Sequence, residues 1–274
     1  MSGPWITFLS DYGHRDEFVG VCHGVIARRA PQARVIDIAH EIPRHDVRSG
    51  ALVLRDAMAY MPAGVHLAVV DPEVGFAGPD GRRAVALRAA QEDHLLVGPD
   101  NGLLMGAAEV LGGVVEAADI GHSSERLEPF SNTFHGRDLF APVAGALAAG
   151  EPLAGIGDPL AVGELRRLEL PLAEVQSDAL RAQVLRCDHF GNLMLNASHS
   201  DLTEAGIRLG GAVAVEVAGQ IHPAHYVSTF ADVAPGTLLL YEDALRNAAL
   251  AVNRGSAAER LGISQDGNVV VRPA

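Results

Sequence analysis

The sequence predicts an α/β domain with a mainly parallel sheet, followed by a small β-barrel domain. Short apolar runs alternate with helical patterns through the first part of the chain, which is typical of strands joined by helices. The pattern becomes irregular over residues 155–174, and beyond it short strands dominate, with only brief helical pieces. We therefore expect a first domain at residues 1–160, a connector at residues 161–177 and a barrel at residues 178–274.

The first domain is expected to open with a strand at residues 5–9, and the loop after this strand carries Asp11. An apolar stripe at helical spacing follows, and Asp16 is the predicted N-cap of that helix. A second strand is predicted at residues 33–38, and the helix after it has Asp46 as its expected cap. This order of elements favours a sheet whose strands run mainly in one direction.

The functional interpretation depends on the third strand, at residues 65–70. This short apolar run is followed at once by Asp71, and a loop rich in Pro and Gly then leads to Arg82 and Arg83. Ligands gather at the carboxyl ends of strands in open α/β sheets, so Asp71 stands where a site is expected. The pattern alone leaves two alternatives, a salt bridge that shapes the loop and the charged wall of an active site.

The rest of the first domain is expected to contain strands at residues 84–89 and 95–97 and a closing helix at residues 138–150. A dense polar stretch precedes this helix and includes His135. A glycine follows His135, so a ligand could approach the backbone closely there, although a lone histidine is more often structural. Asp138 is the predicted N-cap of the helix.

The second domain is expected to contain short strands at residues 181–187, 212–217, 237–241, 247–252 and 268–272. Three polar loops between its elements contain residues that could carry chemistry. The pattern at residues 188–192 is typical of a hairpin turn stabilised by an aspartate side chain. Residues 226–232 place an aromatic side chain in a loop, and residues 253–258 read as a strand-to-helix turn that caps a helix.

Composition restricts the classes of partner and cofactor. The net charge of −13 argues against nucleic-acid and anionic-membrane partners, and its sign favours a cationic small molecule. No apolar run approaches the ~20 residues of a membrane span, and the two cysteines form no C-x-x-C pair, so we expect a cytoplasmic protein. The sequence lacks the usual phosphate-loop, zinc-hydrolase, serine-hydrolase and dinucleotide motifs, and its twelve histidines are not at metal-ligand spacing. We expect no cofactor and no metal.

Six stretches, taken together and in order, make the chain recognisable. They are residues 6–13 (ITFLSDYG), 69–75 (VVDPEVG), 98–103 (GPDNGL), 133–138 (TFHGRD), 188–192 (DHFGN) and 253–258 (NRGSAA). With them the chain resembles the adenosine-forming S-adenosyl-L-methionine (SAM) hydrolase family, which is related to the SAM-dependent fluorinase and chlorinase. The resemblance covers nearly the whole chain. It implies an N-terminal α/β domain, a C-terminal β-barrel and a homotrimer that binds SAM between the subunits.

The resemblance implies that Asp71, Arg82 and His135 hold a water or hydroxide that attacks C5′ of the ribose, so that SAM gives adenosine and L-methionine. The chemistry agrees, because the sulfonium leaves as a neutral thioether and needs no acid. Among the three, only His135 titrates near neutral pH, whereas arginine only donates hydrogen bonds. Arg82 is a better match than Arg83, because a small apolar run follows the pair. Glu73 stands where the family usually has glycine.

The resemblance also implies how the ribose and the methionine part of SAM are held. Asp11 matches the carboxylate that binds both ribose hydroxyls, as two acceptor oxygens can. Asp188 matches the acid that pairs with the methionine ammonium. Arg246 is the expected partner of the methionine carboxylate.

Four further positions match residues around the adenine. Phe190 and Phe230 match aromatic side chains that flank the ring, where stacking contributes ~1–3 kcal/mol by analogy with nucleic-acid bases. Asn192 and Asn253 match positions near the adenine edge. No metal ligand and no cofactor is implied, since SAM is the substrate.

Two alternatives to hydrolysis stay open at this point. A halide-dependent SAM adenosyltransferase of the chlorinase type shares the resemblance, but Asp71 would repel a halide, and the loop insertion of the fluorinase is not visible. A non-catalytic SAM or adenosine binder, from a different functional class, would bind without turnover.

Overall fold

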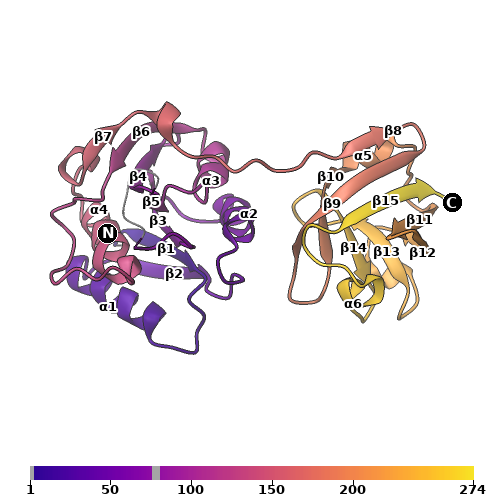
Figure 1. Cartoon of the computed structure of the whole chain (residues 1–274), viewed down its shortest axis with the longest axis horizontal. Helices are drawn as coiled ribbons and strands as arrows, with labels where there is room; N and C mark the ends of the chain where they lie inside the picture. The colour runs from indigo at the N-terminus through magenta and orange to yellow at the C-terminus, as the bar shows by residue number, and fades with distance from the viewer. Residues whose placement is uncertain (1–2, 76–80) are drawn as a thin grey trace. The chain divides into compact units, whose positions relative to one another are not determined.

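The computed structural model describes residues 3–75 and 81–274, so residues 76–80 of the loop expected after Asp71 lie outside the described residues. The chain forms two compact units, Met1–Leu168 and Glu169–Ala274, which are considered separately here (Figure 1). The first is an α/β unit and the second a β-barrel, which confirms the predicted fold class. Among the described residues, no helix has the length and apolar character needed to cross a membrane.

A seven-stranded sheet runs through the described part of the first unit, in the order β2-β1-β3-β5-β4-β6-β7. The pairs β1–β2, β1–β3 and β3–β5 are parallel, and only β4 and β7 run opposite to the other strands. The sheet is therefore mainly parallel, as predicted. Its strands are β1 (Trp5–Ser10), β2 (Arg34–Ala39), β3 (Gly64–Val69), β4 (Ala84–Ala89), β5 (His94–Pro99), β6 (Val114–Asp119) and β7 (Asp158–Leu160).

Helices cover both faces of this sheet, and alternate strand residues feed two apolar cores. Leu67 packs with α1 and α4 on one face, whereas its neighbour Ala68 packs with α2 and α3 on the other. Figure 1 shows these four helices around the sheet. The period-two alternation of a strand buried on both faces accounts for this division. The helices are α1 (Phe18–Arg29), α2 (Val47–Met58), α3 (Met105–Val110) and α4 (Ala141–Ala148), and a π-helical turn (Gly136–Phe140) leads into α4.

One of the three predicted helix caps is confirmed, and two are wrong. Asp46 caps α2, because its Oδ1 accepts from the backbone N–H of Ser49 at 2.9 Å. Asp16 does not cap α1, which begins after Glu17 without a side-chain cap. Asp138 is not a cap either, since it lies inside the π-helical turn. Its buried carboxylate instead accepts from the backbone N–H of Ser131 at 2.9 Å and from the guanidinium of Arg137.

The second unit is a barrel that closes where β9 pairs with β10. Seven strands form the ring in the order β10-β14-β13-β12-β11-β15-β9, and β8 pairs with the outer side of β9. The sequence patterns predicted five of the seven ring strands and missed β10 and β12. The strands are β8 (Glu174–Gln176), β9 (Ala179–Cys187), β10 (Leu193–Ser198), β11 (Ala212–Val217), β12 (Gln220–Tyr226), β13 (Leu238–Glu242), β14 (Asn247–Val252) and β15 (Asn268–Pro273).

Two short helices complete the barrel unit, α5 (His199–Glu204) and α6 (Ala257–Leu261). Ser256 caps α6 by accepting from the backbone N–H of Glu259, as the strand-to-helix pattern at residues 253–258 predicted. The inward-facing side chains of all seven ring strands form one apolar core.

The connections of β1 define where a ligand site is expected in the first unit. The chain leaves β1 for β2 on one side and then continues to β3 on the other, so the strand order reverses at β1. Crevices that bind ligands form at such a point, outside the carboxyl ends of the strands. The parallel register pairs Ser10 with Val69, so Asp11 and Asp71 follow neighbouring strands at the same edge.

Candidate active site

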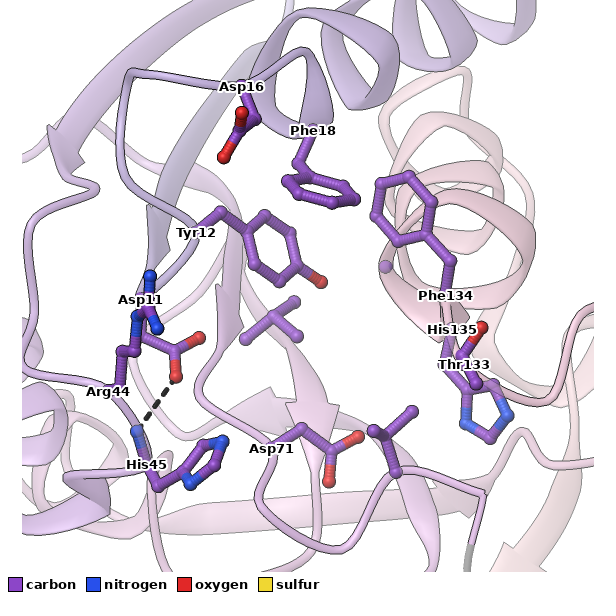
Figure 2. A pocket seen from close by; sticks show the side chains of 13 residues that line it. Asp11, Tyr12, Asp16, Phe18, Arg44, His45, Asp71, Thr133, Phe134 and His135 are labelled. Atoms are coloured by element: carbon purple, nitrogen blue, oxygen red, sulfur yellow. Dashed lines mark hydrogen bonds between the residues drawn. The ribbon is translucent and has the colours of Figure 1, made fainter.

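A cavity of about 340 Å³ lies at the carboxyl ends of β1 and β3. Asp11 and Asp71 border it from the strand ends, and His135 borders it from the segment before α4 (Figure 2). His45, from the loop before α2, closes the side next to Asp11. The structure therefore brings together three of the residues that the sequence singled out, although they are far apart in the chain.

Arg82 joins two of these residues into one hydrogen-bonded group. Its Nε donates to Asp71 Oδ1 at 2.9 Å, and its Nη2 donates to Asp71 Oδ2. The same Nη2 donates to His135 Nδ1 at 2.8 Å. The side chains of Arg82 and Asp71 are each only 6% exposed, so this bidentate ion pair is largely screened from solvent. The Asp71–Arg82 pair is a salt bridge, and its Asp71 member also lines the cavity.

The hydrogen bond from Arg82 fixes the protonation state of His135. Arginine has only donors, so Nδ1 of His135 must accept and the ring proton of the neutral form lies on Nε2. Burial lowers the pKa of His135 below its usual value, and the nearby Arg82 charge lowers it further. At neutral pH His135 is therefore an uncharged imidazole.

The neighbouring arginine belongs to a different network. Arg83 Nε donates to Asp100 Oδ2 at 3.0 Å, and its Nη1 donates to Glu164 at the same distance. The structure thus places Arg82, and not Arg83, against Asp71 and His135. The unusual Glu73 pairs with Arg166 at 3.3 Å and does not line the cavity.

Asp11 is held in place by the backbone of the loop opposite. Its Oδ2 accepts from the backbone N–H of His45 at 3.0 Å, the hydrogen bond drawn in Figure 2. His45 adopts a φ of 65°, a left-handed conformation that is uncommon for a side chain with a Cβ. Backbone strain of this kind often accompanies binding sites, and here it aims the N–H at the Asp11 carboxylate.

Three aromatic side chains of the cavity were not singled out from the sequence. Tyr12, Phe18 and Phe134 form ring contacts at 5.1–5.9 Å along one wall, and those of Phe134 are edge-on (Figure 2). Burial raises the pKa of Tyr12 well above its usual value, so its hydroxyl stays protonated. The stretches at residues 6–13 and 133–138 were the available signals for Tyr12 and Phe134, whereas nothing in the pattern marked Phe18 as more than core.

Gly136 lines the cavity, and it also makes room for the side chain of Tyr12. A Cβ at this position would lie 2.0 Å from the Tyr12 hydroxyl oxygen. We expect Gly136→Ala to lower the free energy of unfolding by about 1–3 kcal/mol, because the ring must shift. Thermal unfolding measures this. Gly24→Ala, in the exposed interior of α1 with no atom near the added methyl, should be neutral or stabilising. Equal melting temperatures for the two variants would contradict the close approach.

Polar and aromatic residues also gather at one end of the barrel unit. Two cavities of about 420 and 380 Å³ share Phe190, Asn192 and Phe230 in their walls. Asp188 and Asn253 line one cavity each. The structure therefore places five of the six predicted residues of this unit on adjoining walls.

The loop that carries Phe190 is the predicted hairpin turn. Asp188 Oδ1 accepts from the backbone N–H groups of Phe190 and Asn192, both at 2.9 Å, between β9 and β10. This turn leaves the Phe190 side chain 73% exposed at its tip. A large apolar ring held out in water by a rigid turn is suited to binding a flat ligand.

Arg246 is not part of these cavity walls. Its side chain is 85% exposed and pairs with Glu242 at 2.8 Å. Arg186, which sequence reasoning missed, lines the cavity with Asp188. Its buried Nε has no hydrogen-bond partner among the described residues. Arg186 lies inside β9, where a strand pattern gave no reason to single out one charged residue.

Known proteins match the chain over most of its length. The model of the SAM hydroxide adenosyltransferase N-terminal domain matches residues 6–157, and that of the C-terminal domain matches residues 182–270. An (R)-S-adenosyl-L-methionine hydrolase of Salinispora tropica is 51% identical over 95% of both chains. A fluorinase of Nocardia brasiliensis is 30% identical over 93% of this chain and 92% of its own.

A solved structure agrees with these matches. The crystal structure of an uncharacterized conserved protein from Thermotoga maritima has a TM-score of 0.87 to this chain, with 33% sequence identity. The match covers 97% of this chain and 99% of the other.

Proposed function

The chain belongs to the SAM hydroxide adenosyltransferase family, and from this premise we propose that it hydrolyses SAM to adenosine and L-methionine. The observation that carries the proposal is the hydrogen-bonded Asp71–Arg82–His135 group beside a cavity that Asp11 also lines. The relatives named as SAM hydrolases are more similar to the chain than those named as fluorinases.

In the proposed reaction, a water molecule at the Asp71–Arg82–His135 group attacks C5′ of the ribose. The oxygen–C5′ bond forms as the C5′–sulfur bond breaks, and the bonding pair neutralises the sulfonium of the departing methionine. One proton of the water is accepted by His135 at Nδ1, which ends the hydrogen bond from Arg82. The freed N–H of Arg82 can then stabilise the hydroxide-like oxygen, and Asp71 keeps the guanidinium oriented.

The charges of the first unit suit this substrate. Asp11 offers carboxylate oxygens to the ribose hydroxyls, and the acidic side chains around the cavity favour a cationic sulfonium. In the barrel unit, we propose that Phe190 and Phe230 flank the adenine and that Asn192 and Asn253 contact its edge. Asp188 is the proposed partner of the methionine ammonium. For the methionine carboxylate we propose Arg246, which the exposed ion pair with Glu242 leaves free to turn.

An assay in oxygen-labelled water tests the proposed function. Purified protein incubated with SAM should release methionine and place the label on the 5′-hydroxyl of adenosine. If high enzyme concentrations release no adenosine, the chain is not a SAM hydrolase. Tight binding of SAM without turnover would indicate the non-catalytic binder.

The halide-dependent adenosyltransferase makes a different product. This alternative requires that 5′-halo-adenosine forms when chloride or fluoride is present. The buried carboxylate of Asp71 opposes a halide at this wall, so we expect added halide to leave the product unchanged. The proposed reaction uses no cofactor, and we propose a cytoplasmic location, where SAM is made.

The rate should fall at acid pH with a midpoint below 6.5, the usual pKa of histidine. His135 must be neutral to accept the bond from Arg82, and its pKa is lowered by burial and by that arginine. The rate is therefore full above the lowered pKa and is lost as pH falls through it. Profiles of kcat/KM against pH measure the midpoint. In His135→Asn, the residual activity should no longer fall at acid pH. If it still falls, a group other than His135 is responsible.

We further propose that the protein is a homotrimer in which each site combines the first unit of one subunit with the barrel unit of its neighbour. The support is that each unit carries only part of the recognition chemistry. Co-expression of Asp71→Asn with Asp188→Ala should restore activity, because some sites then contain two intact halves. Co-expression of Asp71→Asn with Arg82→Lys should not, because both changes lie in the first unit. Light scattering measures the molar mass of the assembly and so tests whether it is a trimer. Absence of rescue in the first pair would contradict the shared site.

A further inference from the structure

Away from the cavity, three side chains of the first unit converge, two of them partly exposed and one buried. His23 comes from α1, Asp37 from β2, and His40 follows the end of β2. His23 Nε2 lies 2.8 Å from Asp37 Oδ1, and His40 Nε2 lies 3.0 Å from the same oxygen. The three potential ligand atoms all lie within 4.8 Å of one another. The histidine spacing did not predict this cluster, because the parallel pairing of β1 with β2 and the packing of α1 bring it together.

His40 is the least expected member of the group. Its side chain is fully buried, yet among the described residues its Nε2 has no hydrogen-bond partner. The approach to Asp37 Oδ1 has the distance of an ion pair but not the geometry of a hydrogen bond. A buried ring nitrogen left in this way is costly unless something else satisfies it.

We propose that His23 Nε2, His40 Nε2 and Asp37 Oδ1 bind one divalent transition-metal ion, of which Zn²⁺ is the reference case. Two imidazoles and one carboxylate form a common ligand set for such ions, with remaining positions taken by water. Ligand atoms ~2.0–2.2 Å from a tetrahedral zinc lie ~3.3–3.6 Å apart, so the 2.8 and 3.0 Å separations of the two histidines from Asp37 would widen by about 0.5 Å when an ion binds. A hard ion such as Mg²⁺ prefers oxygen ligands and is not favoured.

The surroundings of His40 are those of a metal-binding histidine. Its other ring nitrogen, Nδ1, is bonded to Ser10 Oγ at 2.7 Å, which fixes the ring orientation in the way that outer partners of metal ligands do.

A metal ion here would tie α1 to β2 and, through His40, to the loop that leads into the active-site cavity. Ser10 Oγ accepts from the backbone N–H of Tyr12, and the backbone N–H of Gly13 donates to the carbonyl of His40 at 2.7 Å. The ion lies outside the cavity, so its expected role is to stabilise this loop and not to take part in the chemistry. The proposal does not depend on which reaction the cavity performs.

Zinc titration of the tag-free protein tests the proposal. Calorimetry should show one Zn²⁺ bound per chain, and Zn²⁺ should raise the melting temperature. His23→Ala and Asp37→Ala change partly exposed residues and should weaken binding at least 10-fold. His122→Ala, which removes an exposed histidine elsewhere in the same unit, should bind as the unmodified protein does. Co²⁺ in place of Zn²⁺ should give visible absorption bands that are lost in the first two variants.

Three results would overturn the proposal. One is the absence of stoichiometric Zn²⁺ uptake by the unmodified protein. A second is uptake that His23→Ala and Asp37→Ala leave unchanged. A third is uptake that His122→Ala reduces as much as they do, because binding would then be spread over surface histidines.

Discussion

An Asp71→Asn variant should hydrolyse SAM about 10²–10⁴ times more slowly than the unmodified protein, with the loss in kcat. The asparagine amide has about the same size but only one acceptor oxygen, so it cannot take both hydrogen bonds that Asp71 accepts from Arg82. Without its carboxylate, Arg82 is a buried charge with no counter-charge beside His135. The guanidinium is then no longer held in the orientation that binds the attacking oxygen.

Breaking this pair should also lower stability, and the experiment has to separate the two effects. Removing one partner of a buried ion pair costs about 3–5 kcal/mol. Rates are therefore measured well below the melting temperature of the variant, with circular dichroism as the check on folding. Asp11→Asn is the matched control, since it should raise KM more than it lowers kcat. A folded Asp71→Asn protein with unchanged kcat would remove Asp71 from the chemistry.

The sequence predicted the position of Asp71 well because the signal was local. A short apolar run followed by an acid is enough to mark the carboxyl end of a buried strand. The same holds for the hairpin at residues 188–192, where Asp188 forms its turn with its own neighbours. Features that depend on a few consecutive residues are those that a single sequence can specify.

Features that depend on distant neighbours were predicted less well. Asp16 and Asp138 have the residue type of an N-cap, but tertiary contacts decide their roles: Asp16 lines the cavity, and Asp138 is buried against Ser131. The strand β10 was missed because a dense polar turn adjoins it, and β12 because it contains a proline. The cluster of His23, Asp37 and His40 was missed because His23 lies on α1, away from the segment that carries Asp37 and His40.

The two adjacent arginines show most clearly that a single sequence does not specify contacts between distant residues. The resemblance favoured Arg82, but nothing in the order Gly81-Arg82-Arg83-Ala84 states which guanidinium reaches Asp71. The strand decides this, because successive side chains next to β4 point to opposite faces of the sheet. One face leads to Asp71 and His135, and the other leads to Asp100 and Glu164.

Arg82→Lys and Arg83→Lys should therefore differ although they make the same change at neighbouring positions. A lysine at position 82 keeps the charge but cannot present the guanidinium fork, so it cannot hold both oxygens of Asp71 and Nδ1 of His135 together. We expect kcat to fall about 10²–10³-fold. At position 83 the partners are the exposed Glu164 and the buried Asp100, and neither lines the cavity, so the change should lower stability while kcat stays within about 3-fold.

Steady-state kinetics with SAM, together with melting temperatures, measure both variants. The Arg83→Lys protein is the control for charge, size and expression, since only the location of the side chain differs. If the two variants lose activity equally, the effect belongs to the loop as a whole and not to the guanidinium beside Asp71. If Arg83→Lys is the more impaired, the assignment of the catalytic arginine is reversed. The predicted order, a large loss at Arg82 and a small one at Arg83, follows from which face of the sheet each arginine occupies.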